Sequence, residues 1–418
     1  MLGQTNAKVV TGGSQQRGEY FVKVIDYDGT VLDEQWLDDG AEYTLPSAPD
    51  NTSKGLVFQE WSCSETITNG KITIDKNNVM VGAIYTTASG QNEVDVEVNA
   101  NTGLSVTVYA EGVKDWGDGT SSDTTAHTYS SYGQYTIKFS GAIRTNLITY
   151  SSGFFAQNSN GNYYAKAVRF ATSLSSTGIP NNMFNYCFSL EYITIPKDQA
   201  TSVGTFFTTD GCKVNAIILP NSVTSFGGFN SYSVRNIVIP KGVTSVGNIT
   251  CSLRNIVIPK GVTSVGVFSN SYALEEINLF NVSSIGGFDN CCSLKKVKIS
   301  GNVTSIPTYC FRQNYSLEEV EIPDSVTSFS QYSFYNDYSL RKINIPNSVT
   351  SFDVAVFSNC HCVEEYDFSK LNSIPTLGST SVFSGINKLC KIKVPTALYD
   401  QWIVAQYWST YASNIVAV

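Results

Sequence analysis

The chain has 418 residues and a formal net charge of −8, and only 15% of its residues are charged. Nucleic-acid binding requires clustered Lys and Arg, so this charge balance argues against it. The sequence contains no run of 18 consecutive apolar residues, the length that a membrane-spanning helix needs. Hydrophobic residues make up 42% of the chain, with 24 Tyr and 22 Phe, and this content argues against disorder. The chain has only two His and no familiar catalytic motif, which argues against an enzyme.

Residues 1–17 are predicted to form an N-terminal arm that is flexible or ordered only by a partner. The segment is polar, with a Gly- and Gln-rich stretch at 11–16, and it has no core of its own. Its first residues show neither the basic nor the apolar region of a signal peptide, so no export signal is expected.

Residues 18–90 predict a small module of strands. Strands are expected at 21–25 and 31–36 around an Asp28-Gly29 turn, and further strands at 40–46, 55–61 and 81–85. This order resembles the Listeria–Bacteroides (internalin-B-type) repeat, which implies a β-grasp-like spacer.

Residues 91–143 predict a small β-sandwich. The runs Asp115-Trp116-Gly117-Asp118-Gly119, His127-Thr128-Tyr129 and 133–137 resemble the PKD-type immunoglobulin-like module. Turn chemistry is favoured over calcium binding for Asp115 and Asp118, because the spacing does not match a calcium loop. His127 is expected to be a structural contact.

Residues 144–395 repeat one pattern. Its Leu or Val anchors are Leu190, Val214, Val234, Leu253, Leu274, Leu294, Leu317, Leu340, Val363 and Leu389. The spacing of 19 to 26 residues lies in the leucine-rich-repeat range. Each unit predicts two short strands, Val-Thr-Ser-Phe and Leu-x-x-Ile-x-Ile. Their apolar residues are expected to point inward and to stack from coil to coil into one core. A Phe six residues before most anchors is expected to fill the middle of the coil. Units between Val214 and Leu294 are short, which predicts local curvature or a reduced convex segment.

The run Ser-Leu-x-x-Ile-x-Ile-Pro followed by Val-Thr-Ser-Ile resembles the BspA-type leucine-rich repeat. The resemblance implies a β-solenoid of about ten coils that binds partners, since such repeats are linked to binding host matrix proteins and other cells. Residues 396–418 predict a C-terminal cap, with a helix presenting Leu398, Trp402 and Ala405 on one face and a last strand at 415–418.

Outward positions of the second strand alternate in charge from coil to coil. This predicted charge ladder consists of Arg254, Glu275, Glu276, Lys295, Lys296, Lys298, Glu318, Glu319, Glu321, Arg341, Lys342, Glu364, Glu365, Asp367, Lys391 and Lys393. Opposite charges on neighbouring strands attract and like charges repel, so the ladder is expected to fix which coil stacks on which. Paired carboxylates for glycoside cleavage are the disfavoured alternative.

The ten cysteines are expected to be reduced and stacked in the coil interior. Several recur two residues before the anchor (Cys212, Cys251, Cys292) or three before it (Cys187, Cys291, Cys360), and no C-x-x-C pairs occur. A metal corner at Cys360-His361-Cys362 is disfavoured, since alternation would split its side chains between two faces. No cofactor and no metal are expected. Tyr232, Tyr272, Tyr315 and Tyr338 are candidate ligand-binding residues, in loops rich in Asn and Ser, with stacking without a ligand as the alternative.

The sequence therefore predicts a mainly β, multi-domain rod: arm, β-grasp-like module, Ig/PKD-like sandwich, BspA-type solenoid and short helical cap. The preferred function is a non-enzymatic virion surface protein, a head or tail fibre or decoration, that adheres to host cells. Its partners would be other virion proteins through the arm and a host surface protein or glycan, with a homo-oligomer left open. The alternative is a bacterial cell-surface adhesin.

Overall fold

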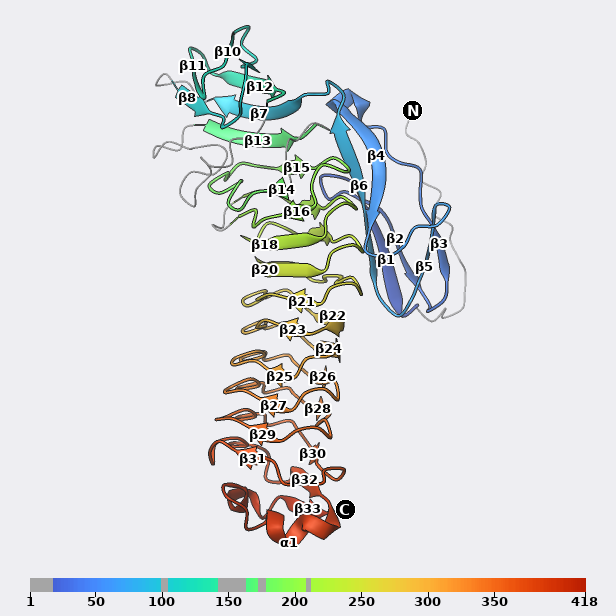
Figure 1. Ribbon diagram of the computed structural model, residues 1–418, viewed down its shortest axis with the longest axis vertical. Coiled ribbons are helices and arrows are strands. Elements are labelled where there is room, and N and C mark those ends of the chain that lie inside the picture. The colour runs from blue at the N-terminus through green and yellow to red at the C-terminus, as the bar shows by residue number, and fades with distance from the viewer. Residues whose placement is uncertain (1–17, 99–103, 142–162, 172–177, 208–211) are drawn as a thin grey trace, which may run out of the picture.

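A computed structural model describes residues 18–98, 104–141, 163–171, 178–207 and 212–418. The predicted arm, residues 1–17, lies outside the described residues. The molecule is a long column of stacked coils with a sandwich at one end and a helical cap at the other (Figure 1). No helix in the described ranges is long and apolar enough to cross a membrane.

The side module, residues 18–90, is a four-stranded sheet in the order β2-β1-β6-β4, with a separate β3–β5 pair. Its elements are β1 (Tyr20–Ile25), β2 (Val31–Leu37), β3 (Glu42–Thr44), η1 (Thr52–Lys54), β4 (Leu56–Cys63), β5 (Lys71–Thr73) and β6 (Val79–Thr87). β1 and β2 are antiparallel across the turn at Asp28-Gly29, and β1 is parallel to β6. Strands thus lie at the five predicted places.

The sandwich region continues into the solenoid. Its strands are β7 (Asn92–Val98), β8 (Leu104–Thr107), β9 (Lys114–Asp115), β10 (Ser121–Ser122), β11 (Ala126–Tyr129) and β12 (Gly133–Phe139). β7 pairs on one side with β12 and on the other with β13 (Tyr163–Arg169), which in turn pairs with β15 (Tyr192–Thr194) of the next coil. The sandwich therefore covers the first coil through a shared six-stranded sheet.

The coils stack two columns of parallel strands. The Val-Thr-Ser-Phe column contains β14 (Gly178–Ile179), β16 (Ser202–Val203), β18 (Ser225–Ser231), β20 (Ser245–Cys251), β21 (Ser264–Val265), β23 (Ser284–Ile285), β25 (Ser305–Ile306), β27 (Ser328–Phe329), β29 (Ser351–Phe352) and β31 (Thr376–Leu377). The Leu-x-x-Ile-x-Ile column contains β15, β17 (Ala216–Ile218), β19 (Asn236–Val238), β22 (Glu276–Val282), β24 (Lys296–Gly301), β26 (Glu319–Glu321), β28 (Lys342–Ile343), β30 (Glu365–Asp367) and β32 (Lys391–Val394).

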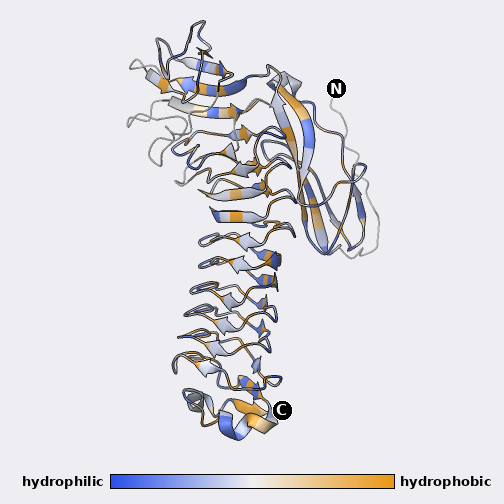
Figure 2. Cartoon of the chain, viewed as in Figure 1, coloured by the Kyte–Doolittle hydropathy of each residue, from blue (hydrophilic) through white to orange (hydrophobic). Residues whose placement is uncertain are grey.

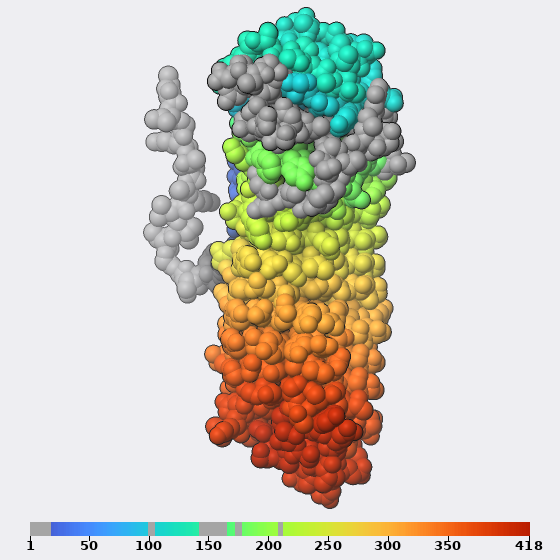
Figure 3. Space-filling model, turned by 90° about the vertical axis from the view of Figure 1, so that its left-hand side faces the viewer, coloured from blue at the N-terminus to red at the C-terminus, as the bar shows by residue number. Residues whose placement is uncertain are grey.

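Nine of the ten predicted anchors and the predicted Phe residues form one continuous core that also includes the sandwich and the cap. The expectation was wrong for Leu389, which is 84% exposed, while the adjacent Cys390 is buried in the core. Rings of Phe268, Phe288, Phe311, Phe334 and Phe357 stack in sequence, with centroids 5.2 to 5.6 Å apart. The prediction that a Phe six residues before the anchor fills the middle of the coil is confirmed for these five coils and for Phe383, which stacks on Phe357. Figure 3 shows the coils following one another without interruption down the column.

In the short coils the convex segment is reduced, as expected. β18 and β20 continue for seven residues where the 23-residue coils form turns at 308–313, 331–336 and 354–359. The coils approach so closely that a Cβ on Gly247 would lie 2.2 Å from the carbonyl oxygen of Gly227, which explains glycine at this position.

The C-terminal cap closes the end of the core. It contains η3 (Thr396–Leu398), α1 (Tyr399–Trp402), η4 (Trp408–Tyr411) and β33 (Ile415–Ala417), and β33 adds to β32 in parallel. Trp402 and Trp408 are buried against Phe368. The cap is confirmed, although its helix is shorter than predicted.

One expectation was wrong: the side module is not a spacer in line with the rod. β6 packs against β15, β17 and β19, and the module lies along the flank of the upper coils (Figure 1). A separate apolar cluster joins them, formed by Phe21, Ile25, Met80, Ile84, Ala216, Ile218, Val238 and Val257. The module therefore returns along the column and covers part of it.

Candidate functional site

The predicted charge ladder lies in register on consecutive coils. Glu276 is opposite Lys296, Lys296 opposite Glu319, and Glu319 opposite Lys342. Lower down, Lys391 and Lys393 lie opposite Glu365 and Asp367. Hydrophilic residues accordingly mark β22 and β24 on the outer edge of the column (Figure 2).

Ion pairs connect several of these positions. Arg254 contacts Glu275 at 2.9 Å, Lys298 contacts Glu321 at 3.0 Å, and Lys393 contacts Glu365 at 2.7 Å, while Glu319 lies between Lys296 and Lys342. The hydrogen bond from Lys342 lowers the pKa of Glu319 below its ordinary value. Seven ladder residues form no ion pair with another described residue: Glu276, Lys295, Glu318, Arg341, Glu364, Asp367 and Lys391. Exposed ion pairs stabilise a fold only weakly, and a role of the ladder in setting coil register stays a prediction.

The candidate tyrosines fall into two groups. Tyr315 stacks on Tyr338 at 5.4 Å, and Tyr338 stacks on His361 at 5.5 Å, with rings within 17° of parallel. Tyr232 stacks on Tyr272 at 6.2 Å, although the two residues are two coils apart. Tyr315 and Tyr338 are 39% and 41% exposed, so this ring stack (Tyr315, Tyr338 and His361) presents its edges to solvent.

The disfavoured metal and calcium candidates have other contacts. Cys360 is buried and Cys362 exposed, while His361 bonds to the carbonyl oxygen of Gly385. No group of three or more potential metal ligands occurs within the described ranges. Asp118 contacts His127 at 2.7 Å, and His127 stacks on buried Trp116, an arrangement that braces the sandwich.

None of the ten cysteines, all within the described ranges, forms a disulfide. Eight are buried, seven of them in the core of the coils and Cys63 in the core of the side module. Cys292 is half-buried and Cys362 exposed, so the expected ladder inside the coils was wrong for these three residues. Burial raises the pKa of three of the interior thiols, to about 12 for Cys291 and well above the ordinary value for Cys310 and Cys360. These thiols are poor nucleophiles.

In one coil a carboxyl group takes the interior position that Cys291 and Cys360 occupy in theirs. Asp337 occupies the position three residues before the anchor, is fully buried, and accepts a hydrogen bond from the backbone N–H of Asn314 at 2.9 Å. Its second oxygen has no hydrogen-bond partner among the described residues. Burial raises the pKa of Asp337 well above its ordinary value, so the group is held neutral.

The interface between the side module and the coils was not predicted. Ala216, Ile218, Val238 and Val257 occupy outward positions that carry charges in lower coils, and this apolar run was the signal that another segment covers them. Gly82 of β6 permits the contact, because a Cβ there would lie 2.6 to 2.9 Å from the side chain of Ile218.

Comparison with known proteins agrees with these coils. The model of the BspA type leucine rich repeat region matches residues 177–287, 248–364 and 284–401, more than half of the chain. The chain belongs to this family. No curated protein matches it.

Solved structures share the repeat. A leucine-rich repeat protein from Bacteroides ovatus is 25% identical over 60% of this chain, with a TM-score of 0.50, and the chain spans 66% of that protein's length. One from Eubacterium ventriosum is 19% identical over 53% of this chain and 83% of its own, with a TM-score of 0.31. A leucine rich cell surface protein from Faecalibacterium prausnitzii is 18% identical over 49% of this chain and 90% of its own, with a TM-score of 0.22.

Proposed function

We propose that this BspA-type protein is a non-enzymatic surface protein that adheres to cells through its uncovered lower coils. The observation that carries the proposal is the ring stack of Tyr315, Tyr338 and His361 on a rigid column. Tyr offers large contact area at low entropic cost together with a hydroxyl group, a combination common in binding surfaces. The neighbouring charge ladder is largely self-neutralised, which favours a partner that is not strongly charged.

Cell binding of the purified protein tests this proposal. The Tyr315→Ala, Tyr338→Ala double variant should lose most binding to target cells in flow cytometry, because two of the three rings of the stack are removed. Tyr132→Ala is the matched control, since Tyr132 is 64% exposed and lies in the sandwich. Equal binding by the double variant and the control would refute the role of the ring stack.

The surface that carries the protein has a second candidate: the virion of a bacterial virus instead of a bacterial cell. Ten cysteines without a disulfide fit assembly in a reducing compartment, whereas exported proteins usually oxidise theirs. In this case residues 1–17 would attach the chain to other virion proteins. Mass spectrometry should then find the chain in purified particles, and deletion of residues 1–17 should abolish its incorporation. Recovery only from the outer surface of bacterial cells would favour the cell-surface adhesin.

A further inference from the structure

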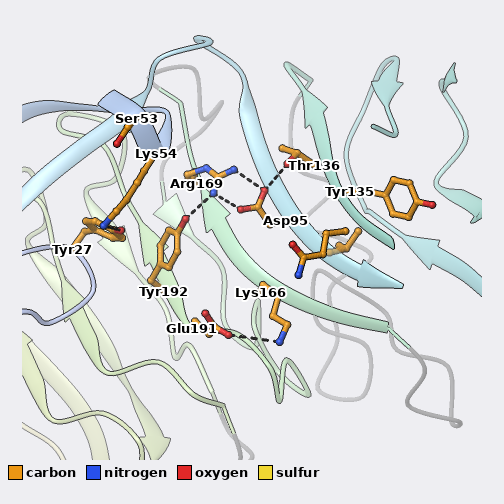
Figure 4. A pocket seen from close by; sticks show the side chains of 12 residues that line it. Tyr27, Ser53, Lys54, Asp95, Tyr135, Thr136, Lys166, Arg169, Glu191 and Tyr192 are labelled. Carbon is orange, nitrogen blue, oxygen red and sulfur yellow. Dashed lines mark hydrogen bonds and ion pairs between the residues drawn. The ribbon is translucent and has the colours of Figure 1, made fainter. Parts of the chain in front are cut away.

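A cleft of about 680 Å³ lies where the three parts of the molecule meet. Tyr27 and Lys54 enter it from the side module, Asp95 from the sandwich, and Lys166 and Tyr192 from the first coils (Figure 4). Such volumes are typical of small-ligand sites, which occur preferentially at domain interfaces. We refer to it as the junction cleft.

The wall of the junction cleft is held by Arg169. This side chain is buried, and its guanidinium donates to both oxygens of Asp95, to Glu93 at 3.0 Å and to the hydroxyl of Tyr192 at 2.7 Å. Thr136 donates to the same Asp95 carboxylate at 2.8 Å. The wall is therefore fixed before any ligand arrives, which lowers the entropic cost of binding.

Carboxylates and cations are nearly balanced around the cleft. Lys166 lies 3.1 Å from Glu97 and 3.7 Å from Glu191, and Arg169 pairs with Glu93 and Asp95. Lys54 forms no ion pair with another described residue, but four carboxylates against three cations leave little attraction for an anion such as phosphate. The mostly polar lining equally disfavours a lipid.

Donors and acceptors nevertheless remain beside aromatic rings. Lys54 donates to the hydroxyl of Tyr27 at 2.9 Å and has further N–H groups, while Gln134 adds an exposed amide. The ring of Tyr27 is only 5% exposed and supports Tyr192 edge to face at 4.8 Å. Tyr192 and Tyr135 are half-buried and supply the ring surface of the cleft. Aromatic rings attract the weakly positive C–H groups of a sugar, and mixed donors and acceptors match its hydroxyls.

We propose that the junction cleft binds a neutral saccharide, at a site separate from the ring stack. This inference does not depend on the proposed adhesion through Tyr315 and Tyr338. A protein with both sites would contact a cell surface by its lower coils and hold a sugar at the other end of the column.

The test uses the full chain on an array of neutral gluco-, galacto-, manno- and N-acetylglucosamine oligosaccharides, with sialylated and sulfated glycans beside them. A neutral hit is then titrated by calorimetry. Lys54→Ala and Gln134→Ala should each weaken its binding about tenfold, the effect of losing one or two hydrogen bonds. Lys388→Ala and Gln401→Ala, at exposed positions near the cap, are the matched controls and should bind as the parent does.

Three outcomes would overturn the proposal: no neutral glycan binds, only charged glycans bind, or the cleft variants bind a neutral glycan as well as their controls do. The Tyr315→Ala, Tyr338→Ala variant separates the two sites. It should retain saccharide binding even where it loses cell binding, and loss of both would assign the sugar to the ring stack instead of the cleft.

Discussion

The upper and lower coils use the same outward positions differently. In the coils anchored at Val214 and Leu253 these positions hold Ile218 and Val257, which are buried under the side module. In the coil anchored at Leu317 the equivalent position holds Glu321, which is paired with Lys298 and partly exposed. One backbone therefore supports either an apolar contact with another segment or a charged surface, and the outward residues decide which.

A charge at a covered position should have the largest effect. Ile218→Asp would bury an unpaired carboxylate against β6, and an uncompensated buried charge costs about 3–5 kcal/mol. We expect a large decrease in the free energy of unfolding, measured by chemical denaturation, and faster hydrogen exchange in β6 and β17. Asn278→Asp is the matched control, because Asn278 is the equivalent residue of β22 and lies opposite Lys298. A similar loss in both variants would contradict the distinction between covered and uncovered coils.

The sequence predicted the coils well because every repeat has the same spacing of apolar residues. Phe311, Phe334 and Phe357 recur at one phase, so the core could be inferred from spacing alone. The side module's position depends on contacts such as Gly82 with Ile218, more than a hundred residues apart, which no local period encodes. The junction cleft was missed for the same reason, because Tyr27, Asp95 and Tyr192 come from three separate parts of the chain.

A substitution inside the lower coils should stabilise them. Asp337→Asn keeps the acceptor for the N–H of Asn314 and removes the carboxyl, and Asn already occupies this position in the preceding coil. A raised pKa in the folded state means that the contribution of neutral Asp337 to stability is complete below about pH 4, the ordinary pKa of Asp, and is lost as the pH rises toward the folded value.

The advantage of Asp337→Asn over the parent should therefore grow as the pH rises from about 4 to about 7, by up to about 1.4 kcal/mol per pH unit while the folded group stays protonated. Chemical denaturation at several pH values measures it. A constant difference across this range would show that the carboxyl does not titrate as proposed.

Reversal of the charge ladder should have a smaller effect. Replacing Glu318, Glu319 and Glu321 by Lys places three positive coils side by side, because Lys296 and Lys342 flank Glu319. The thermal unfolding midpoint should fall by a few degrees and recover in high salt, since screening weakens the repulsion between exposed charges. Adding Lys296→Glu and Lys342→Glu restores alternation around residue 319 and should restore most of the midpoint. An unchanged midpoint at low salt would contradict a role in stacking.

The smallest effect is expected for the buried cysteines, which lie in the core of both regions. Cys212 and Cys251 lie in the upper coils, and Cys310 and Cys360 in the lower ones, yet all four are buried in the same core. Because the side module covers the outside of the coils and not their interior, protection from alkylation should be similar in the two regions. In the native protein a thiol reagent should label Cys362 first and Cys292 more slowly, and after denaturation without reductant it should label ten thiols. Peptide mapping measures each site separately. Faster labelling of the lower cysteines would mean that the uncovered coils open more readily, and the contrast between the two regions would then extend from their surfaces into their core.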